Sequence, residues 1–343
     1  MQIAHHPFGL SFWSLVPPYF AEATKMGKCR IVVRMPNPLK YIEHGSLYLI
    51  TSRAEEGLPL ADERRFKLIA ESIMARAQFL YPVELVAYDF GTNHFHLVLV
   101  PIDPIDVPLF VGYVKQELSH AVNRIKGIRK RTIWCDGYDS PILLGYAEAL
   151  HYLCYCYTQS QFAHQADTIE DKRGASSWEQ FTTGRLARSY KRLLRTDFED
   201  RIDLNEELKS NREEHTLVVS PYAWLKRLAP EVSEQEVKRI IIDRVRELEA
   251  EYREERRRAG IKIYKNTSPS RAQEYRPKKF GKRMICICWD IAQRISFLGW
   301  VKDRYADCKR VLARWRAGDR SEQWPPGFFP PSMPVLAWAL PDT

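Results

Sequence analysis

Apolar and polar positions in the first half of the chain follow two different periods, and together they predict alternating strands and helices. Residues 46–52 form a short apolar run rich in β-favouring side chains, which predicts a first strand. Residues 60–80 carry apolar side chains at the spacing of an amphipathic helix. Residues 83–90 and 94–101 are two further apolar runs, and the Gly-Thr-Asn turn between them predicts a β-hairpin.

Helical spacing returns over residues 109–125, and a further helix is predicted over residues 147–162. A strand or loop is expected between them, over residues 133–144. The order strand, helix, hairpin, helix, strand, helix predicts an α+β fold, specifically a ferredoxin-like antiparallel sheet with helices on one face.

The pattern changes after about residue 170. Ser233 and Glu236 form a capping box that predicts a helix running to about residue 258, with Gly260 as its stop signal. Residues 263–283 are predicted to be a basic linker, and residues 291–317 one or two further helices. Residues 179–343 are therefore expected to form a mainly helical, basic C-terminal extension.

Composition narrows the class of protein. Lys plus Arg number 52 against 43 for Asp plus Glu, and the net charge of +9 favours an anionic partner such as nucleic acid, or serves solubility alone. The seven cysteines are odd in number and scattered, which excludes a secreted disulfide framework and indicates a reducing cytoplasm. Cys154, Cys156, Cys286 and Cys288 are expected to pack in the core.

The apolar stretch near the N-terminus is interrupted by Pro17 and Pro18 and is preceded by no Lys or Arg. We expect neither a signal peptide nor a membrane span there. Residues 1–33 are predicted to be an N-terminal extension, with Met26 or Met35 as alternative starts of the first domain.

Two histidines give the first candidate chemistry. His94 and His96 are two apart on a predicted strand, so both side chains project from the same face, roughly 7 Å apart along the chain. Two imidazoles in this arrangement can share one metal ion. The alternative is a chance pair of histidines with a packing role.

A second candidate group lies on the predicted helix about sixty residues later. Tyr155 and Gln159 are four apart, so they share one helix face. A nucleophile and a metal ligand could therefore meet at one site, although a tyrosine hydroxyl needs assistance to become nucleophilic. The alternative is that Tyr152 and Tyr155 pack the helix on the sheet.

Asn93-His94-Phe95-His96 resembles the Asn-His-hydrophobic-His strand of the HUH single-tyrosine transposases, including the REP-associated branch. The likeness extends to residues 34–38, 45–53, 121–127 and 132–134, and it covers residues 34–178, which we predict to be an HUH transposase-like catalytic domain. The segments at residues 251–260, 313–320 and 324–328 are similar to the C-terminal extension of longer members.

The resemblance implies specific roles. Tyr155 would be the nucleophile, with Tyr152 in reserve, and His94, His96 and Gln159 would hold Mg²⁺ or Mn²⁺, which would act as a Lewis acid on the scissile phosphate. The chain would then be an endonuclease and joining enzyme of DNA transposition or recombination, forming a 5′-phosphotyrosine. Departures from the family pattern are Gln159-Ser160 in place of Asn-Pro and His164 in place of a glycine.

The resemblance also implies a partner and a location. The partner would be single-stranded DNA with imperfect palindromes that fold into hairpins, bound in the bacterial cytoplasm at the nucleoid by a homodimer or a monomer. Cationic side chains after the second helix are candidates for phosphate contacts, with a solvated helix end as the alternative. They are Arg124, Lys126, Arg129, Lys130 and Arg131.

Two rival functions remain open at this point. The first is a catalytically retired protein that binds hairpin nucleic acid without cutting it, which the missing Asn-Pro suggests. The second is a metal hydrolase that uses His94 and His96 without a protein-linked intermediate.

Overall fold

The computed structural model describes residues 40–55, 65–125, 127, 133–135, 137–172, 174–193, 212–263 and 284–331. These residues fall into two compact units, one within Glu43–Ile291 and the other formed by residues 40–42 and 292–331. The domain boundary expected near residue 178 lies inside the first unit, and the division into domains stays a prediction.

A five-stranded sheet forms the centre of the first unit. Its strands are β1 (Leu47–Arg53), β2 (Val83–Phe90), β3 (His94–Pro101), β4 (Ile142–Leu143) and β7 (Cys286–Ile287). They lie in the order β2-β3-β1-β4-β7, antiparallel except for the parallel pair β4–β7. The first strand and the hairpin predicted from the sequence are confirmed, and so is the α+β class.

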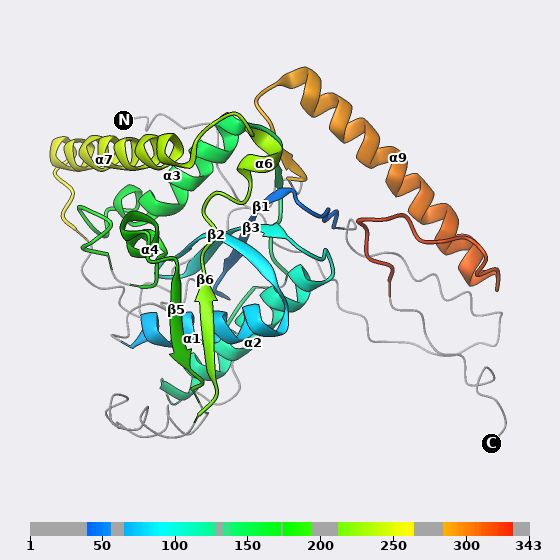
Figure 1. The fold of residues 1–343 in the computed structure, drawn as a ribbon, viewed down its shortest axis with the longest axis horizontal. Coiled ribbons are helices and arrows are strands. Elements are labelled where there is room, and N and C mark those ends of the chain that lie inside the picture. The colour runs from blue at the N-terminus through cyan, green and yellow to red at the C-terminus, as the bar shows by residue number, and fades with distance from the viewer. Residues whose placement is uncertain are drawn as a thin grey trace, which may run out of the picture. The chain divides into compact units, whose positions relative to one another are not determined.

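Helices cover both faces of this sheet (Figure 1). On one face α1 (Phe66–Leu80) and α2 (Asp106–Ile125) pack together, and Phe66 contacts Phe90, which contacts Phe95 of β3. On the other face α3 (Tyr146–Phe162) packs on Val98 and Val100. Both faces of β3 are largely buried, so each needs a cover. The sequence predicted helices on one face of the sheet. α1 and α2 share one face as predicted, but α3 covers the other face.

The region after α3 contains strands as well as helices. Its elements are α4 (Trp178–Thr183), β5 (Ala187–Lys191), β6 (Glu214–Val218), α6 (Leu225–Leu228) and α7 (Glu234–Arg258). β5 and β6 pair antiparallel as a separate two-stranded sheet that packs against α1. The sequence patterns did not predict these two short strands, because they gain their burial from α1 and not from a long apolar run of their own.

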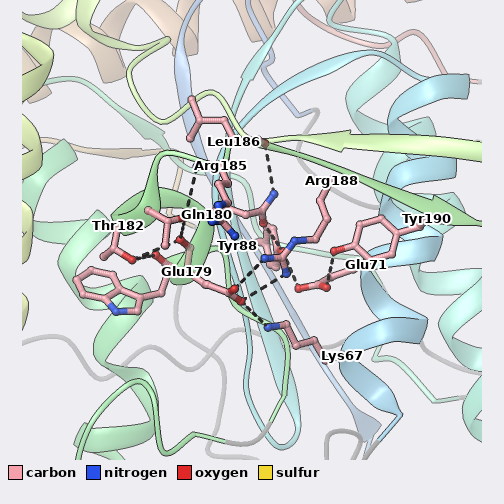
Figure 2. A network of polar contacts seen from close by, with 12 residues as sticks. Lys67, Glu71, Tyr88, Glu179, Gln180, Thr182, Arg185, Leu186, Arg188 and Tyr190 are labelled. Atoms are coloured by element: carbon pink, nitrogen blue, oxygen red, sulfur yellow. Dashed lines mark hydrogen bonds and ion pairs between the residues drawn. The ribbon is translucent and has the colours of Figure 1, made fainter. Parts of the chain in front are cut away.

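A buried polar network joins α1 to this second sheet (Figure 2). The Glu71 carboxyl is 2% exposed and accepts hydrogen bonds from the hydroxyls of Tyr88, at 2.9 Å, and Tyr190, at 2.7 Å. Gln180 extends the network by donating to the Leu186 carbonyl at 3.3 Å. Burial raises the pKa of Glu71, and the two tyrosine hydrogen bonds oppose that rise.

The predicted helix after residue 233 is present as α7. Ser233 caps it by accepting a hydrogen bond from the Glu236 amide at 3.2 Å, and the chain leaves the helix at Gly260 with φ +64°. Val237, Ile241 and Val245 fall on one face of the helix and pack into the core beside α3. α7 is therefore a structural neighbour of the helix that carries Tyr155.

The second unit is built around α9 (Ile291–Arg316), which is one continuous helix where one or two were expected. Trp300 and Phe328 both pack on the ring of Tyr41, at centroid distances of 5.0 and 5.1 Å. Gly327 is required there because a Cβ atom would lie 2.5 Å from the Tyr41 ring. Within the described ranges no helix, including α7 and α9, is long and apolar enough to cross a membrane.

The cysteines behave as small hydrophobic residues, as predicted. Cys154, Cys156, Cys286 and Cys288 are all buried. The predicted linker over residues 263–283 lies outside the described residues except for its first position. The predicted N-terminal extension, residues 1–33, also lies outside them.

Candidate metal and tyrosine site

β3 brings the two predicted histidines together on the sheet face that α3 covers. The rings of His94 and His96 lie 5.0 Å apart between centroids, and His96 is only 3% exposed. In the antiparallel register β1 places Thr51 opposite His96 and Arg53 opposite His94. Cross-strand partners share a face, so all four side chains belong to one surface.

Neighbouring side chains hold one nitrogen of each imidazole. Nδ1 of His96 lies 2.9 Å from the Thr51 hydroxyl, and Nδ1 of His94 lies 3.0 Å from Oδ1 of Asn93. Nε2 of His96 is buried and has no hydrogen-bond partner among the described residues. A buried polar atom without a partner is costly, so this nitrogen has the character expected of a ligand position.

The third predicted ligand reaches the histidines from α3. Oε1 of Gln159 lies 3.3 Å from Nε2 of His94, while Nε2 of Gln159 donates to the Tyr155 carbonyl, also at 3.3 Å. A neutral His94 carries one N–H; when Nδ1 donates it to Asn93 Oδ1 in a hydrogen bond, Nε2 has no proton for Gln159. Two acceptor atoms therefore face each other, which is the arrangement a shared cation would satisfy.

Tyr155 lies beside the same histidines. Its ring is half-buried and meets the His96 ring at a centroid distance of 5.5 Å, nearly edge to face. Tyr152, the reserve candidate, is 3% exposed in the core, and burial raises its pKa to about 12. Of the two phenols, Tyr155 is the one with access to solvent and to the imidazoles.

Burial keeps both imidazoles in the neutral form. It lowers the pKa of His94 to about 4, with smaller contributions in the same direction from Arg53 and Lys172. It lowers the pKa of His96 further, again with burial as the largest cause. Neutral imidazoles at pH 7 are the form that binds metal ions.

The Tyr155 hydroxyl is also neutral at pH 7. Burial raises its pKa above the ordinary value of 10, and a hydrogen bond from Gln159 opposes the rise. The phenol therefore needs to lose a proton as it reacts, and a cationic surrounding would favour that loss.

Two charged features of the site were missed from the sequence. Lys172 and Asp89 form an ion pair that is 2% and 1% exposed, and Asp89 stands opposite His96 in the register of β2 and β3. Arg53 shares the face of His94 from the other side, on β1. Strand register and the fold of the chain after α3 create these neighbours, and no local motif marks them.

The donor set fits a divalent ion that accepts both nitrogen and oxygen ligands. His94, His96 and Gln159 offer two neutral imidazoles and one amide oxygen, and the described residues contain no cluster of three or more His, Cys, Asp or Glu side chains suited to a metal. Because the three donors are uncharged, they would leave the charge of the ion for an anionic substrate.

None of the predicted phosphate-contacting residues lies at this site in the described part of the chain. Arg124 lies in the last turn of α2. Lys126, Arg129, Lys130 and Arg131 lie outside the described residues, and their role stays a prediction.

Comparison with known proteins finds a distant structural likeness. No protein-family model matches the chain, and no curated protein matches it. A solved structure described as a REP-associated tyrosine transposase bound to a REP hairpin is similar at 14% identity and a TM-score of 0.37, over 43% of this chain and 86% of that one. These values indicate a distant relationship at most.

Proposed function

We propose that this chain is a metal-dependent enzyme that nicks and rejoins single-stranded DNA through a 5′-phosphotyrosine at Tyr155. The observation that carries the proposal is the meeting of His94, His96 and Gln159, from a strand and a helix, beside the Tyr155 ring. A ferredoxin-like arrangement of the sheet is part of the proposal, and the strand order β2-β3-β1-β4 supports it.

The chemical step is an exchange of phosphodiester bonds. The Tyr155 oxygen attacks the phosphorus, the bond from phosphorus to the 3′-oxygen breaks, and the proton lost by the phenol balances the one gained by the new 3′-hydroxyl. The 5′-phosphotyrosine retains the bond energy, so a second 3′-hydroxyl can attack it and rejoin DNA without ATP. The protein contributes mainly position and charge.

The charges around the site suit a phosphodiester. Arg53 and Lys172 are close enough to contribute to the lowered pKa of His94, as nearby positive charges do. Lys172 does the same for His96. An anionic phosphate would therefore be attracted to the place where the Tyr155 ring meets the two imidazoles.

His94, His96 and Gln159 would hold the divalent ion, Mg²⁺ or Mn²⁺. When bound, the ion would supply a Lewis acid that neutralises charge on the phosphate oxygens. Imidazole nitrogens suit Mn²⁺ better than Mg²⁺, whose preferred ligands are oxygens, so Mn²⁺ is the first ion to test. Thr51 and Asn93 fix the orientation of the two rings.

The decisive experiment is a search for a covalent protein–DNA adduct. The full chain is incubated with Mn²⁺ and labelled hairpin-forming single strands copied from the DNA that flanks its gene. We expect a band that survives denaturation, requires metal and disappears in Tyr155→Phe. Tyr146→Phe, on the same helix, is the matched control and should retain the adduct; Tyr152→Phe tests the reserve residue.

Other outcomes would point to the rival functions. Hairpin binding without any adduct would support a retired binding protein. Cleaved products without a protein-linked intermediate, insensitive to Tyr155→Phe, would support a metal hydrolase. Either result would overturn the proposed mechanism.

A further inference from the structure

A pocket of about 480 Å³ lies between α3 and α7, next to the proposed site. This volume is within the range of about 300–1,000 Å³ typical of small-ligand pockets. α3 and α7 pack directly against each other, and side chains of both helices line the pocket. Both helices belong to the first unit.

Tyr155 is the wall that the pocket shares with the site. Its side chain lines the pocket, and the same ring contacts His96 on the sheet. Only the Tyr155 side chain would therefore separate a group bound in the pocket from the reacting phosphate. In a polynucleotide, the nucleotide next to that phosphate is the group at this distance.

The lining of the pocket suits a flat, partly apolar ligand. Ile240 and Leu248 of α7 supply apolar surface, and Tyr252, one turn beyond Leu248, supplies an aromatic ring. The Tyr252 ring is held by an edge-to-face contact with Phe162 at 5.6 Å. Aromatic and apolar side chains of this kind stack unpaired bases in proteins that bind single strands.

The positive and negative side chains that line the pocket are balanced in number, which disfavours a highly anionic ligand. Arg244 is paired with Glu247 at 2.9 Å and Glu251 at 3.1 Å, so most of its charge is used within α7. Arg239 and Asp243, one helical turn apart, add one cation and one anion to the lining. This balance fits one phosphate beside one base and disfavours a polyphosphate.

We propose that this pocket binds an unpaired nucleobase carrying an exocyclic amino group, from the nucleotide adjacent to the phosphate that Tyr155 attacks. The base stacks on Tyr252, the Asp243 carboxylate accepts from the amino group, and Arg239 contacts the phosphate. Cytosine, adenine and guanine carry such an amino group and thymine does not. The inference rests on the proposed function for its substrate and assigns base selection to α7.

The first test measures binding of short oligo-dC, oligo-dA and oligo-dT to the full chain in a chelating buffer, so that no chemistry occurs. We expect oligo-dC and oligo-dA to bind at least about five times more tightly than oligo-dT. Asp243→Asn should reduce that preference. Tyr252→Ala should weaken all three by about fivefold to a hundredfold, the range that loss of one base–aromatic stack gives, while Tyr252→Phe retains binding.

A second variant guards against loss of folding. Leu248→Trp fills the pocket from α7, and Ala250→Trp adds the same ring at an exposed position of that helix that does not line the pocket. We expect the first to weaken binding and the second to leave it unchanged, with both melting as cooperatively as the parent chain. Equal binding by the parent, Tyr252→Ala and Leu248→Trp would overturn the proposal.

Adduct formation, measured in parallel, separates this inference from the proposed function. Normal adduct formation in Tyr252→Ala and Leu248→Trp would support the proposed enzyme and contradict base binding in the pocket. A base preference in a parent chain that forms no adduct would support the base-binding pocket and contradict the proposed enzyme.

Discussion

At the scale of single residues, two kinds of side chain build the site, and the sequence reveals them unequally. His94, His96, Tyr155 and Gln159 could be selected from spacing on a strand and a helix, because each pair shares one element. Thr51, Arg53, Asp89 and Lys172 could not, because they approach the site through strand register and through the chain after α3. The missed residues orient and charge the site; the predicted ones would react or bind.

Thr51 is expected to tune metal affinity without being a ligand. Thr51→Val removes the hydroxyl that lies 2.9 Å from Nδ1 of His96 and keeps the shape of the side chain. We expect Mn²⁺ to bind about 10- to 100-fold more weakly, the usual cost of losing a partner that orients a ligand. Calorimetric titration of the metal-free chain measures the change.

Thr216→Val is the matched control for that variant. Its hydroxyl meets Ser189 on the exposed side of the β5–β6 sheet, so its removal should leave Mn²⁺ affinity unchanged. Undiminished affinity in Thr51→Val would contradict the assigned role of the hydroxyl.

Lys172 is expected to matter for stability before any effect on chemistry. Lys172→Met leaves the buried Asp89 carboxyl without its ion-pair partner, and we expect a loss of about 3–5 kcal/mol in the free energy of unfolding. Lys67→Met removes an exposed pair with Glu179 and should cost at most about 1 kcal/mol. Urea denaturation of the two variants tests the difference, and equal costs would argue against a buried pair.

At the scale of secondary-structure elements, long periodic segments were predictable and short strands were not. The hairpin of β2 and β3, the helix α3 and the capped helix α7 match the sequence patterns closely. β4 and β7 have two residues each, too few to show a period. β6 did carry a signal, since His215 and Leu217 alternate with exposed neighbours, but its burial depends on α1.

The Glu71 network predicts a pH dependence of stability. Because the pKa of Glu71 is raised in the folded chain, the folded state binds more protons than the unfolded state between the ordinary value of 4.5 and the raised value. Stability contributed by Glu71 is therefore fully present below pH 4.5 and falls as the pH rises through the raised pKa.

Glu71→Gln isolates this contribution. The variant should gain stability relative to the parent chain as the pH rises from about 4.5 to 8, because its amide does not titrate. Urea denaturation at several pH values measures the difference, in which the other titrating groups cancel. Glu179→Gln, in the exposed part of the network in Figure 2, is the control. A difference that stays constant with pH would show that Glu71 does not titrate in this range.

At the scale of the whole molecule, the excess of basic side chains acts on any single-stranded partner. The net charge is +9, and each phosphate contact contributes about −0.7 to the slope of log affinity against log salt. With about three contacts, affinity for an oligonucleotide should fall about twentyfold between 50 and 200 mM salt. Fluorescence anisotropy over this range gives the slope directly.

One variant connects that slope to the pocket. Arg239→Gln should make the slope shallower by about one contact, whereas Lys67→Gln, whose ammonium already pairs with Glu179, should not change it. An affinity independent of salt would contradict a role for the charge in nucleic-acid binding.

Tyr155, the proposed nucleophile, and Gln159, the proposed amide ligand, stand one helical turn apart on α3, while both imidazoles belong to the sheet. Residue 159 is consequently the only one of the three ligand positions that can be exchanged without touching the strand at the centre of the fold. A carboxylate there would steer the centre toward oxygen-seeking ions and an imidazole toward zinc. The choice of ion could thus be engineered, or could drift in evolution, separately from the residue that forms the covalent bond.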